Sequence, residues 1–189
     1  MNRRDAIKRT AILMGGTISA SAMLGVFDGC KADPTIGWPP KFCTTEEGQI
    51  LEAIAGRIIP RTDTPGAVDA GVPAFIDTMM AEFYQEKEKT AFREGLKTVE
   101  ADAQSAHGKS FTTLTPEQQD ELLTKYDKEA FAENNKEDEP HFFRTIKELT
   151  ILGFFTSEPG ATEVLKYDPV PGDYKGCIPY SEVGRTWAT

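Results

Sequence analysis

Histidine and cysteine are scarce in this chain, and that scarcity limits the chemistry it can carry out. Two histidines and three cysteines occur in 189 residues, too few for a His- or Cys-rich metal cluster. Positive charge is also in deficit, because 21 Lys and Arg stand against 30 Asp and Glu, for a formal net charge of −9. Phosphate binding requires a basic surface, so this balance argues against nucleic acid as the main partner.

Recognisable catalytic motifs are missing as well. The sequence contains no Gly-rich phosphate loop after a predicted strand, no G-x-S-x-G and no H-E-x-x-H. Cys43 and Cys177 are candidate nucleophiles, but the histidine bases, His107 beside a helix-ending glycine and His141 in a helix first turn, occupy positions typical of surface residues. Carboxylates are too numerous in an acidic chain to single out a general acid. We therefore predict no catalytic, cofactor-binding or metal-binding residue in this chain.

The charge that is present is unevenly distributed. Residues 1–29 carry a net charge of +2, whereas residues 30–189 carry 17 basic and 28 acidic residues, a net −11. Arg3 and Arg4 precede a weakly apolar run, 11–27, whose Gly and Ser residues make it a poor permanent membrane anchor. This layout is typical of an export signal and resembles the twin-arginine type, which carries folded proteins. We predict that residues 1–30 are such a signal and that the mature protein is periplasmic; the alternative is a solvated basic amphipathic helix.

The three cysteines raise two questions that the sequence leaves open. Gly29-Cys30 resembles the end of a lipoprotein signal, so Cys30 is either lipidated, tethering the protein to the periplasmic side of the membrane, or an ordinary cysteine. An oxidising compartment permits disulfides. Cys43 and Cys177 therefore either pair with each other or leave one cysteine to bond a partner chain.

The hydrophobic periodicity of residues 44–157 predicts helices throughout. No alternation of strands and helices is present, which argues against a parallel sheet. The turn-rich segment 61–71 lacks the acid spacing of a calcium loop and is predicted to be a structural turn. The fifth helix is the most apolar and is predicted to be central. We therefore predict an all-α bundle of about five helices: 44–59 ended by Pro60, 72 to about 89, about 90–106, one opening at Thr115-Pro116 and bearing Leu122 to Phe131, and one opening at Pro140 and bearing Phe142 to Phe154.

The ends of the mature chain follow a different pattern. Residues 31–43 are rich in proline and are predicted to be a linker, and residues 158–189 are rich in Pro, Gly and aromatic residues and are predicted to be a stiff extended tail. Such a tail cannot satisfy its backbone polar groups within itself, so it must lie along a surface. Because tyrosine and tryptophan are enriched at binding hot spots, we predict a partner-binding tail whose contact residues are Tyr167, Pro169, Pro171, Tyr174, Tyr180 and Trp187.

Two stretches of this sequence resemble a known family. IIPRTDTPGA at 58–67, with DAGVP at 69–73 and FID at 75–77, resembles the N-terminal signature of the gluconate 2-dehydrogenase subunit 3 family. FFTSEPGA at 154–161, with YDPVPGDYKGC at 167–177, resembles its C-terminal signature. The likeness extends over about residues 44–187 and includes the twin-arginine leader.

The resemblance implies a function. In that family the small subunit carries no flavin or haem and forms a complex with a larger FAD-dependent oxidoreductase of the glucose–methanol–choline type, which oxidises sugars or sugar acids and passes electrons on, often to a cytochrome c. The small subunit supports maturation of the large one and supplies the twin-arginine signal, read by its translocase, for both. We therefore expect a non-catalytic accessory subunit. The alternatives are a free-standing exported helical binding lipoprotein and an enzyme in its own right.

Overall fold

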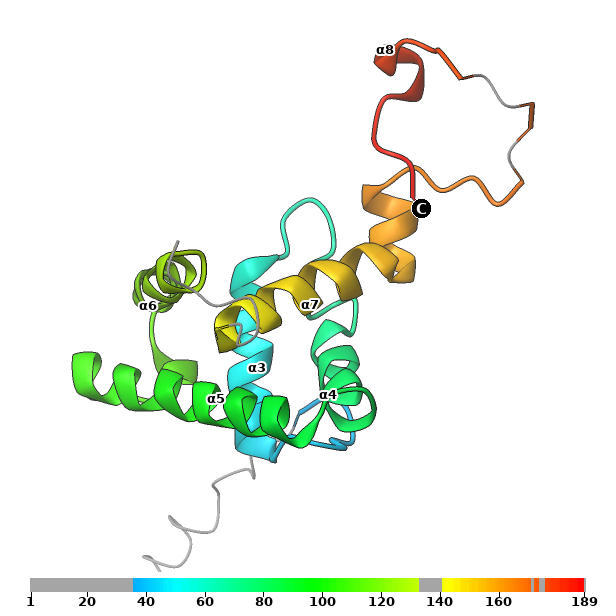
Figure 1. Ribbon diagram of the computed structural model, residues 1–189. Helices are drawn as coiled ribbons and strands as arrows, with labels where there is room; N and C mark the ends of the chain where they lie inside the picture. The colour runs from blue at the N-terminus through cyan, green and yellow to red at the C-terminus, as the bar shows by residue number, and fades with distance from the viewer. Residues whose placement is uncertain (1–35, 133–140, 171, 174–175, 189) are drawn as a thin grey trace, which may run out of the picture. The chain divides into compact units, whose positions relative to one another are not determined.

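The structure is a computed structural model that describes residues 36–132, 141–170, 172–173 and 176–188. Its described part contains no strand and no helix long and apolar enough to cross a bilayer. The all-α prediction is therefore confirmed. The longer helices are α3 (Thr45–Ile58), α4 (Val72–Glu82), α5 (Glu86–His107), α6 (Pro116–Ala130) and α7 (Phe142–Thr156), and the short segments are the 3₁₀ helix η1 (Phe111–Thr113), the π-helical η2 (Gly160–Val164) and α8 (Tyr180–Val183) (Figure 1).

Several helix starts follow directly from the sequence. At the start of α3 the Thr44 hydroxyl accepts a hydrogen bond from the Glu47 amide (3.2 Å), and the Glu47 carboxylate accepts one from the Thr44 amide (2.9 Å). Thr115 and Gln118 form the same reciprocal pair at the start of α6. Each pair satisfies two backbone N–H groups that a helix start otherwise leaves without partners.

The predicted boundary between the second and third helices was wrong. The second helix was expected to run to about Lys89, but α4 ends at Glu82 and α5 begins at Glu86. The Glu88 carboxylate accepts a hydrogen bond from the Gln85 amide at 2.8 Å. This cap starts a new helix at that point. Phe83 follows the end of α4 and is 69% exposed.

The core forms where the other helices pack on α3 and α7. Both of these helices contact α4, α5 and α6, and they also contact each other; Figure 1 shows α7 crossing α3. Leu51 and Ile54 of α3 and Ile146 of α7 are completely buried, and so is Thr150, whose hydroxyl donates to the Ile146 carbonyl at 2.7 Å. The central place predicted for the fifth helix is therefore confirmed, and α3 shares it.

The described part of the predicted linker is held firmly to the helical body. Asp77 of α4 is 1% exposed, and its carboxylate accepts hydrogen bonds from the amides of Lys41 (2.6 Å), Phe42 (3.1 Å) and Cys43 (2.7 Å). Arg93 of α5 donates to the Phe42 carbonyl (2.5 Å), and its guanidinium lies 4.3 Å from the centroid of the Phe42 ring. Ordered packing on the body thus begins several residues before α3.

Candidate partner-binding surface

An apolar groove of about 480 Å³ lies between the end of α3, the loop that follows it, α7 and η2. Its polar lining consists of the Thr62 and Thr64 side chains and Lys147, whose ammonium donates to Asp127 at 2.5 Å. A groove of this composition suits an apolar protein surface better than a sugar, because sugar recognition requires several convergent polar groups. The apolar lining comes from Ile58, Ile59, Pro60, Ile151, Phe154, Phe155 and Val164.

Each of the two signature stretches contributes one wall of this groove. The first stretch contributes residues 58–64 to the groove, with the exception of Arg61 and Asp63. The second stretch contributes Phe154 and Phe155. The sequence placed these stretches far apart along the chain, and only the packing of α7 against α3 brings them together. The first residues of both signatures thus meet at one surface feature.

The first wall is a loop that its own side chains hold in place. The Arg61 guanidinium donates two hydrogen bonds to the Asp69 carboxylate, one of them from Nε at 2.7 Å, and the Gly66 amide donates to the same carboxylate at 2.9 Å. The hydrogen bonds from Arg61 hold the pKa of Asp69 below its usual range. The Ala67 amide donates to the Ile59 carbonyl at 2.9 Å and closes the loop.

This geometry agrees with a structural turn at 61–71. Asp69 is engaged with Arg61 and Gly66, and Asp63 accepts a hydrogen bond from the Thr62 hydroxyl at 3.0 Å. Within the described residues, no group of three or more His, Cys, Asp or Glu side chains is placed to hold a metal ion.

The second wall depends on a tight turn from α7 into η2. The Ser157 hydroxyl donates to the Phe154 carbonyl (2.6 Å) and accepts the Gly160 amide (3.2 Å). A Cβ at Gly160 would lie 1.9 Å from the Phe154 carbonyl oxygen, so no larger residue fits. The Ser-Glu-Pro-Gly sequence therefore directs η2 back toward the groove, where Val164 lines it.

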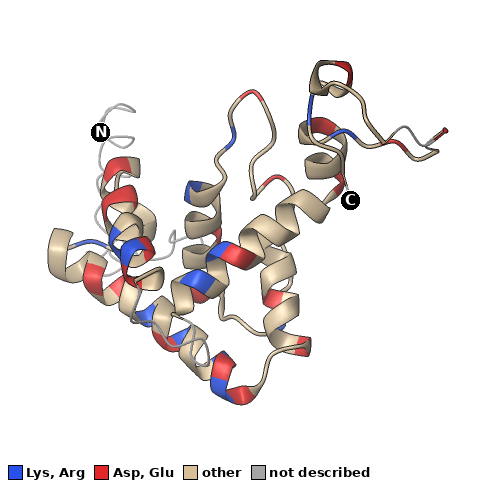
Figure 2. Cartoon of the chain, turned by 45° about the horizontal axis from the view of Figure 1, so that its top comes forward, with Lys and Arg blue, Asp and Glu red and all other residues tan. Residues whose placement is uncertain are grey.

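A second apolar face of α7 was missed by the sequence analysis. Ile151 is 42% exposed, Leu152 49% and Phe155 39%, and residues 149–157 contain no charge (Figure 2). The prediction followed the buried stripe alone. The available signal was that this half of the helix is apolar on all sides, which indicates that more than one face is covered.

The predicted tail residues are mostly exposed, but the tail is not simply extended. Tyr167, Pro169, Tyr180 and Trp187 are exposed, while Pro171 and Tyr174 lie outside the described residues. The tail contains η2 and α8, and Lys166 pairs with Trp187 in an isolated parallel bridge. Outside η2 and α8 the described tail has no regular secondary structure, and it satisfies part of its backbone by pairing its two ends. Partner contact by these residues stays a prediction.

The cysteines of the described chain are both free thiols. Cys43 is buried under the Asp77 carboxylate, and burial, with that negative charge second, raises the pKa of its thiol far above the usual value. It is therefore an inert core residue and a poor nucleophile. Cys177 is exposed in the tail. The structure does not form the intrachain bond, and a bond from Cys177 to a partner stays a prediction; Cys30 and the export pair Arg3 and Arg4 lie outside the described residues.

Both histidines were predicted to be surface residues. In the structure they are half-buried and have contacts with neighbouring side chains or backbone. His107 Nδ1 lies 3.3 Å from the Gln118 amide nitrogen. His141 Nδ1 accepts the Phe143 amide at the start of α7 (3.3 Å), and burial lowers the pKa of its imidazole. The Tyr126 ring, 6.4 Å from the His141 ring between centroids, contributes to that burial.

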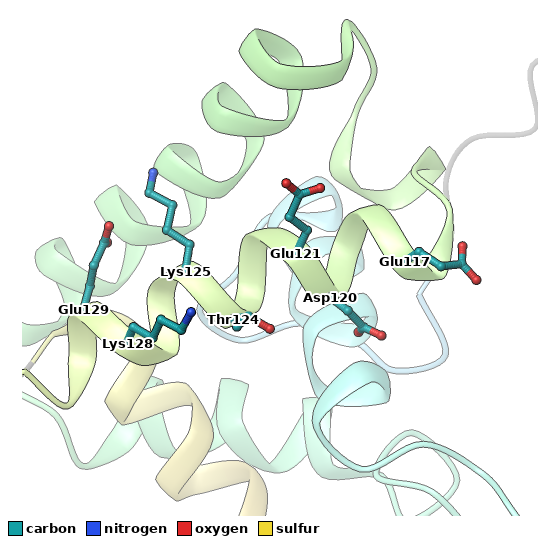
Figure 3. Close-up of a pocket in the computed structure, with 7 residues that line it drawn as sticks. All are labelled: Glu117, Asp120, Glu121, Thr124, Lys125, Lys128 and Glu129. Carbon is teal, nitrogen blue, oxygen red and sulfur yellow. The ribbon is translucent and has the colours of Figure 1, made fainter.

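A shallow depression along α6 is a less suitable site. Figure 3 shows that its lining side chains come from one helix and spread along it without converging. Asp120 is already paired with Arg57 (2.5 Å), and Lys125 with Asp102 (3.0 Å). We interpret this surface as a solvated helix face. It is lined by Glu117, Asp120, Glu121, Thr124, Lys125, Lys128 and Glu129.

Comparison with known proteins identifies a family. A family model described as Gluconate 2-dehydrogenase subunit 3 matches residues 45–172, which include the whole of the first signature and both walls of the groove. Comparison of the chain with curated proteins and with solved structures found no match.

Proposed function

The chain belongs to the gluconate 2-dehydrogenase subunit 3 family, and we therefore propose that it is the non-catalytic small subunit of a periplasmic dehydrogenase. Its partner in this proposal is an FAD-dependent catalytic subunit of the glucose–methanol–choline type that oxidises a sugar or sugar acid. FAD is held by that partner, which passes its electrons to an acceptor such as a cytochrome c subunit. The observation that carries the proposal is the groove, whose lining includes the first residues of both family signatures.

The exposed apolar surface supports a stable complex. Ile151, Leu152 and Phe155 lie on one stretch of α7 beside the groove, and leaving such side chains in water is unfavourable. Burying a large apolar side chain completely contributes about 1.5–3 kcal/mol, and half-exposed ones contribute a part of that. The centres of protein interfaces are depleted in charge and rich in aromatic residues, and this stretch of α7 has that composition.

We further propose that this subunit supports maturation of the catalytic subunit and its export. A twin-arginine signal carries folded proteins, so a flavoprotein that lacks its own signal would cross the membrane while bound to this chain. After export the complex remains in the periplasm, held to the membrane if Cys30 is lipidated. Residues 1–29 have a basic net charge and the remainder an acidic one, which supports the division of the chain into an export signal and a mature domain.

Changing Arg3→Lys together with Arg4→Lys tests this proposal. Twin-arginine recognition depends on the arginine pair, so we expect both subunits to accumulate in the cytoplasm and dehydrogenase activity to disappear from the periplasm. Cell fractionation with an immunoblot for each subunit measures the outcome. Arg9→Lys, which leaves the pair intact, is the matched control and should export both subunits normally. Export of the catalytic subunit alongside the double variant would contradict the passenger model.

A further inference from the structure

The tail of this protein closes on itself. The Lys166 amide donates to the Thr186 carbonyl (2.8 Å), and the Ala188 amide donates to the Lys166 carbonyl (2.9 Å). These two bonds make the bridge between Lys166 and Trp187. In Figure 1 the chain leaves η2, passes through α8 and returns to where the loop began.

Side chains reinforce this closure. The Lys166 ammonium lies 4.3 Å from the centroid of the Trp187 ring, a cation–π arrangement. The same ammonium is 3.4 Å from the Val183 carbonyl, and the Arg185 guanidinium donates to the Glu163 carbonyl of η2 at 2.5 Å. We call the interacting groups of Glu163, Lys166, Val183, Arg185, Thr186 and Trp187 the clasp.

The loop held by the clasp displays large apolar side chains. Tyr167 is 57% exposed, Val170 81%, Ile178 38% and Tyr180 68%. Residues 166–188 contain three basic and three acidic residues, so the net charge of −11 on residues 30–189 lies entirely outside the loop. A neutral loop with exposed aromatic and aliphatic side chains on an acidic protein has the composition of an interface.

The clasp also connects this loop to the groove. Val164 lines the groove and lies two residues before Lys166, and Glu163 of the clasp belongs to η2, which packs on α7. The base of the loop is therefore fixed next to the apolar face of α7. The two surfaces are continuous along the chain and can be covered by one partner.

We infer that the clasp pre-orders the tail loop as a docking element for an apolar, weakly charged surface of the catalytic subunit, and that Trp187 is a positioning residue of this loop. The inference rests on the proposed function, which names that partner. A loop that is already closed loses less conformational entropy on binding than a free tail, so closure raises affinity without adding a contact. Tyr167, Val170, Ile178 and Tyr180 then provide the contact surface.

The test compares clasp variants in binding to the purified catalytic subunit and in the free chain. Trp187→Ala and Lys166→Met are each expected to weaken binding about tenfold, since ordering a few side chains and their backbone is then required on association. The double variant should bind the catalytic subunit with the same affinity as the single variant that binds less tightly, because both changes open the same clasp. Trp187→Phe, which keeps an aromatic ring for Lys166, should restore most of the affinity.

Hydrogen exchange of the free chain supplies a readout that direct partner contact would not change. The Lys166 and Ala188 amides should exchange faster in Trp187→Ala than in the wild type. Tyr180→Ala is the matched control, because it removes a contact side chain and should weaken binding while leaving both amides protected.

The outcomes separate this inference from the proposed function. If the wild-type chain does not bind the catalytic subunit, both fail. If the wild type binds and both clasp variants bind with the affinity of the wild type, the clasp has no role in docking. Weaker binding by Trp187→Ala with unchanged amide exchange would make Trp187 a partner contact and overturn its positioning role.

Discussion

Replacing Asp77 by alanine is expected to lower the free energy of unfolding by about 3–5 kcal/mol, because it removes three hydrogen bonds to a carboxylate and each such bond contributes about 1.5–3 kcal/mol before the structure relaxes. The Asp77 carboxylate is 1% exposed and accepts three backbone amides from residues 41–43. The Cys43 amide is buried, and leaving such an amide without a partner costs about 1–3 kcal/mol, whereas the amides of Lys41 and Phe42 are only partly buried. Release of the segment to water relieves part of that cost but exposes Phe42 and Cys43. The total free energy of unfolding of a native protein is about 5–15 kcal/mol, so the expected loss is a large share of it.

Urea unfolding of the purified chain measures this effect, because a shift of the midpoint at constant slope reports a change in stability. Asp63→Ala is the matched control. Asp63 is exposed and accepts a bond from the neighbouring Thr62 hydroxyl, so its replacement should change stability by less than about 0.5 kcal/mol. Equal midpoints for Asp77→Ala and Asp63→Ala would show that the carboxylate does not hold the segment.

Replacing Gly95 by alanine is expected to destabilise the protein by about 2 kcal/mol, although alanine is the better helix former. A Cβ at Gly95 of α5 would lie 2.2 Å from Cγ and 2.6 Å from Cβ of Phe142 on α7. The base of a side chain cannot swing away, so α5 and α7 would have to separate. Overpacking of this kind costs about 1–3 kcal/mol and occasionally more, which exceeds the gain of about 1 kcal/mol in helix propensity.

Gly56→Ala provides the comparison within the same fold. Gly56 also lies inside a helix, α3, but the nearest atom to its added Cβ is the Cγ2 of Val68 at 3.3 Å, the end of a side chain that can move. The propensity term should therefore dominate, leaving stability unchanged or raised by up to about 1 kcal/mol. Thermal unfolding of the two variants measures the difference. Equal stability of Gly95→Ala and Gly56→Ala would contradict the close packing of α5 on α7.

Local signals predicted the fold well because most of its helices begin at short-range patterns. Thr44 with Glu47 and Thr115 with Gln118 are capping pairs readable from adjacent residues. The missed boundary after α4 depended on Gln85 with Glu88, a less typical pair inside a continuous helical pattern. An apolar stripe that continues across such a break gives no sign of it.

The candidate site was less accessible to sequence reasoning because it depends on contacts between distant residues. The walls of the groove come from residues 58–64 and 154–155, and nothing in either stretch predicts the other. The same holds for Asp77 with residues 41–43 and for Lys166 with Trp187, which are separated along the chain. Periodicity identified which faces are apolar, whereas which apolar faces remain uncovered depends on how the helices pack.

We propose that this chain is one subunit of a dehydrogenase and that its partner carries out the chemistry. Gentle purification of the tagged chain from its native host, followed by size-exclusion chromatography with flavin absorbance and a dye-linked sugar oxidation assay, tests it most directly. We predict that the chain co-elutes with a yellow flavoprotein and that the heteromeric peak oxidises a sugar or sugar acid. Recovery of the chain as a flavin-free monomer, or sugar oxidation by the isolated chain, would contradict it.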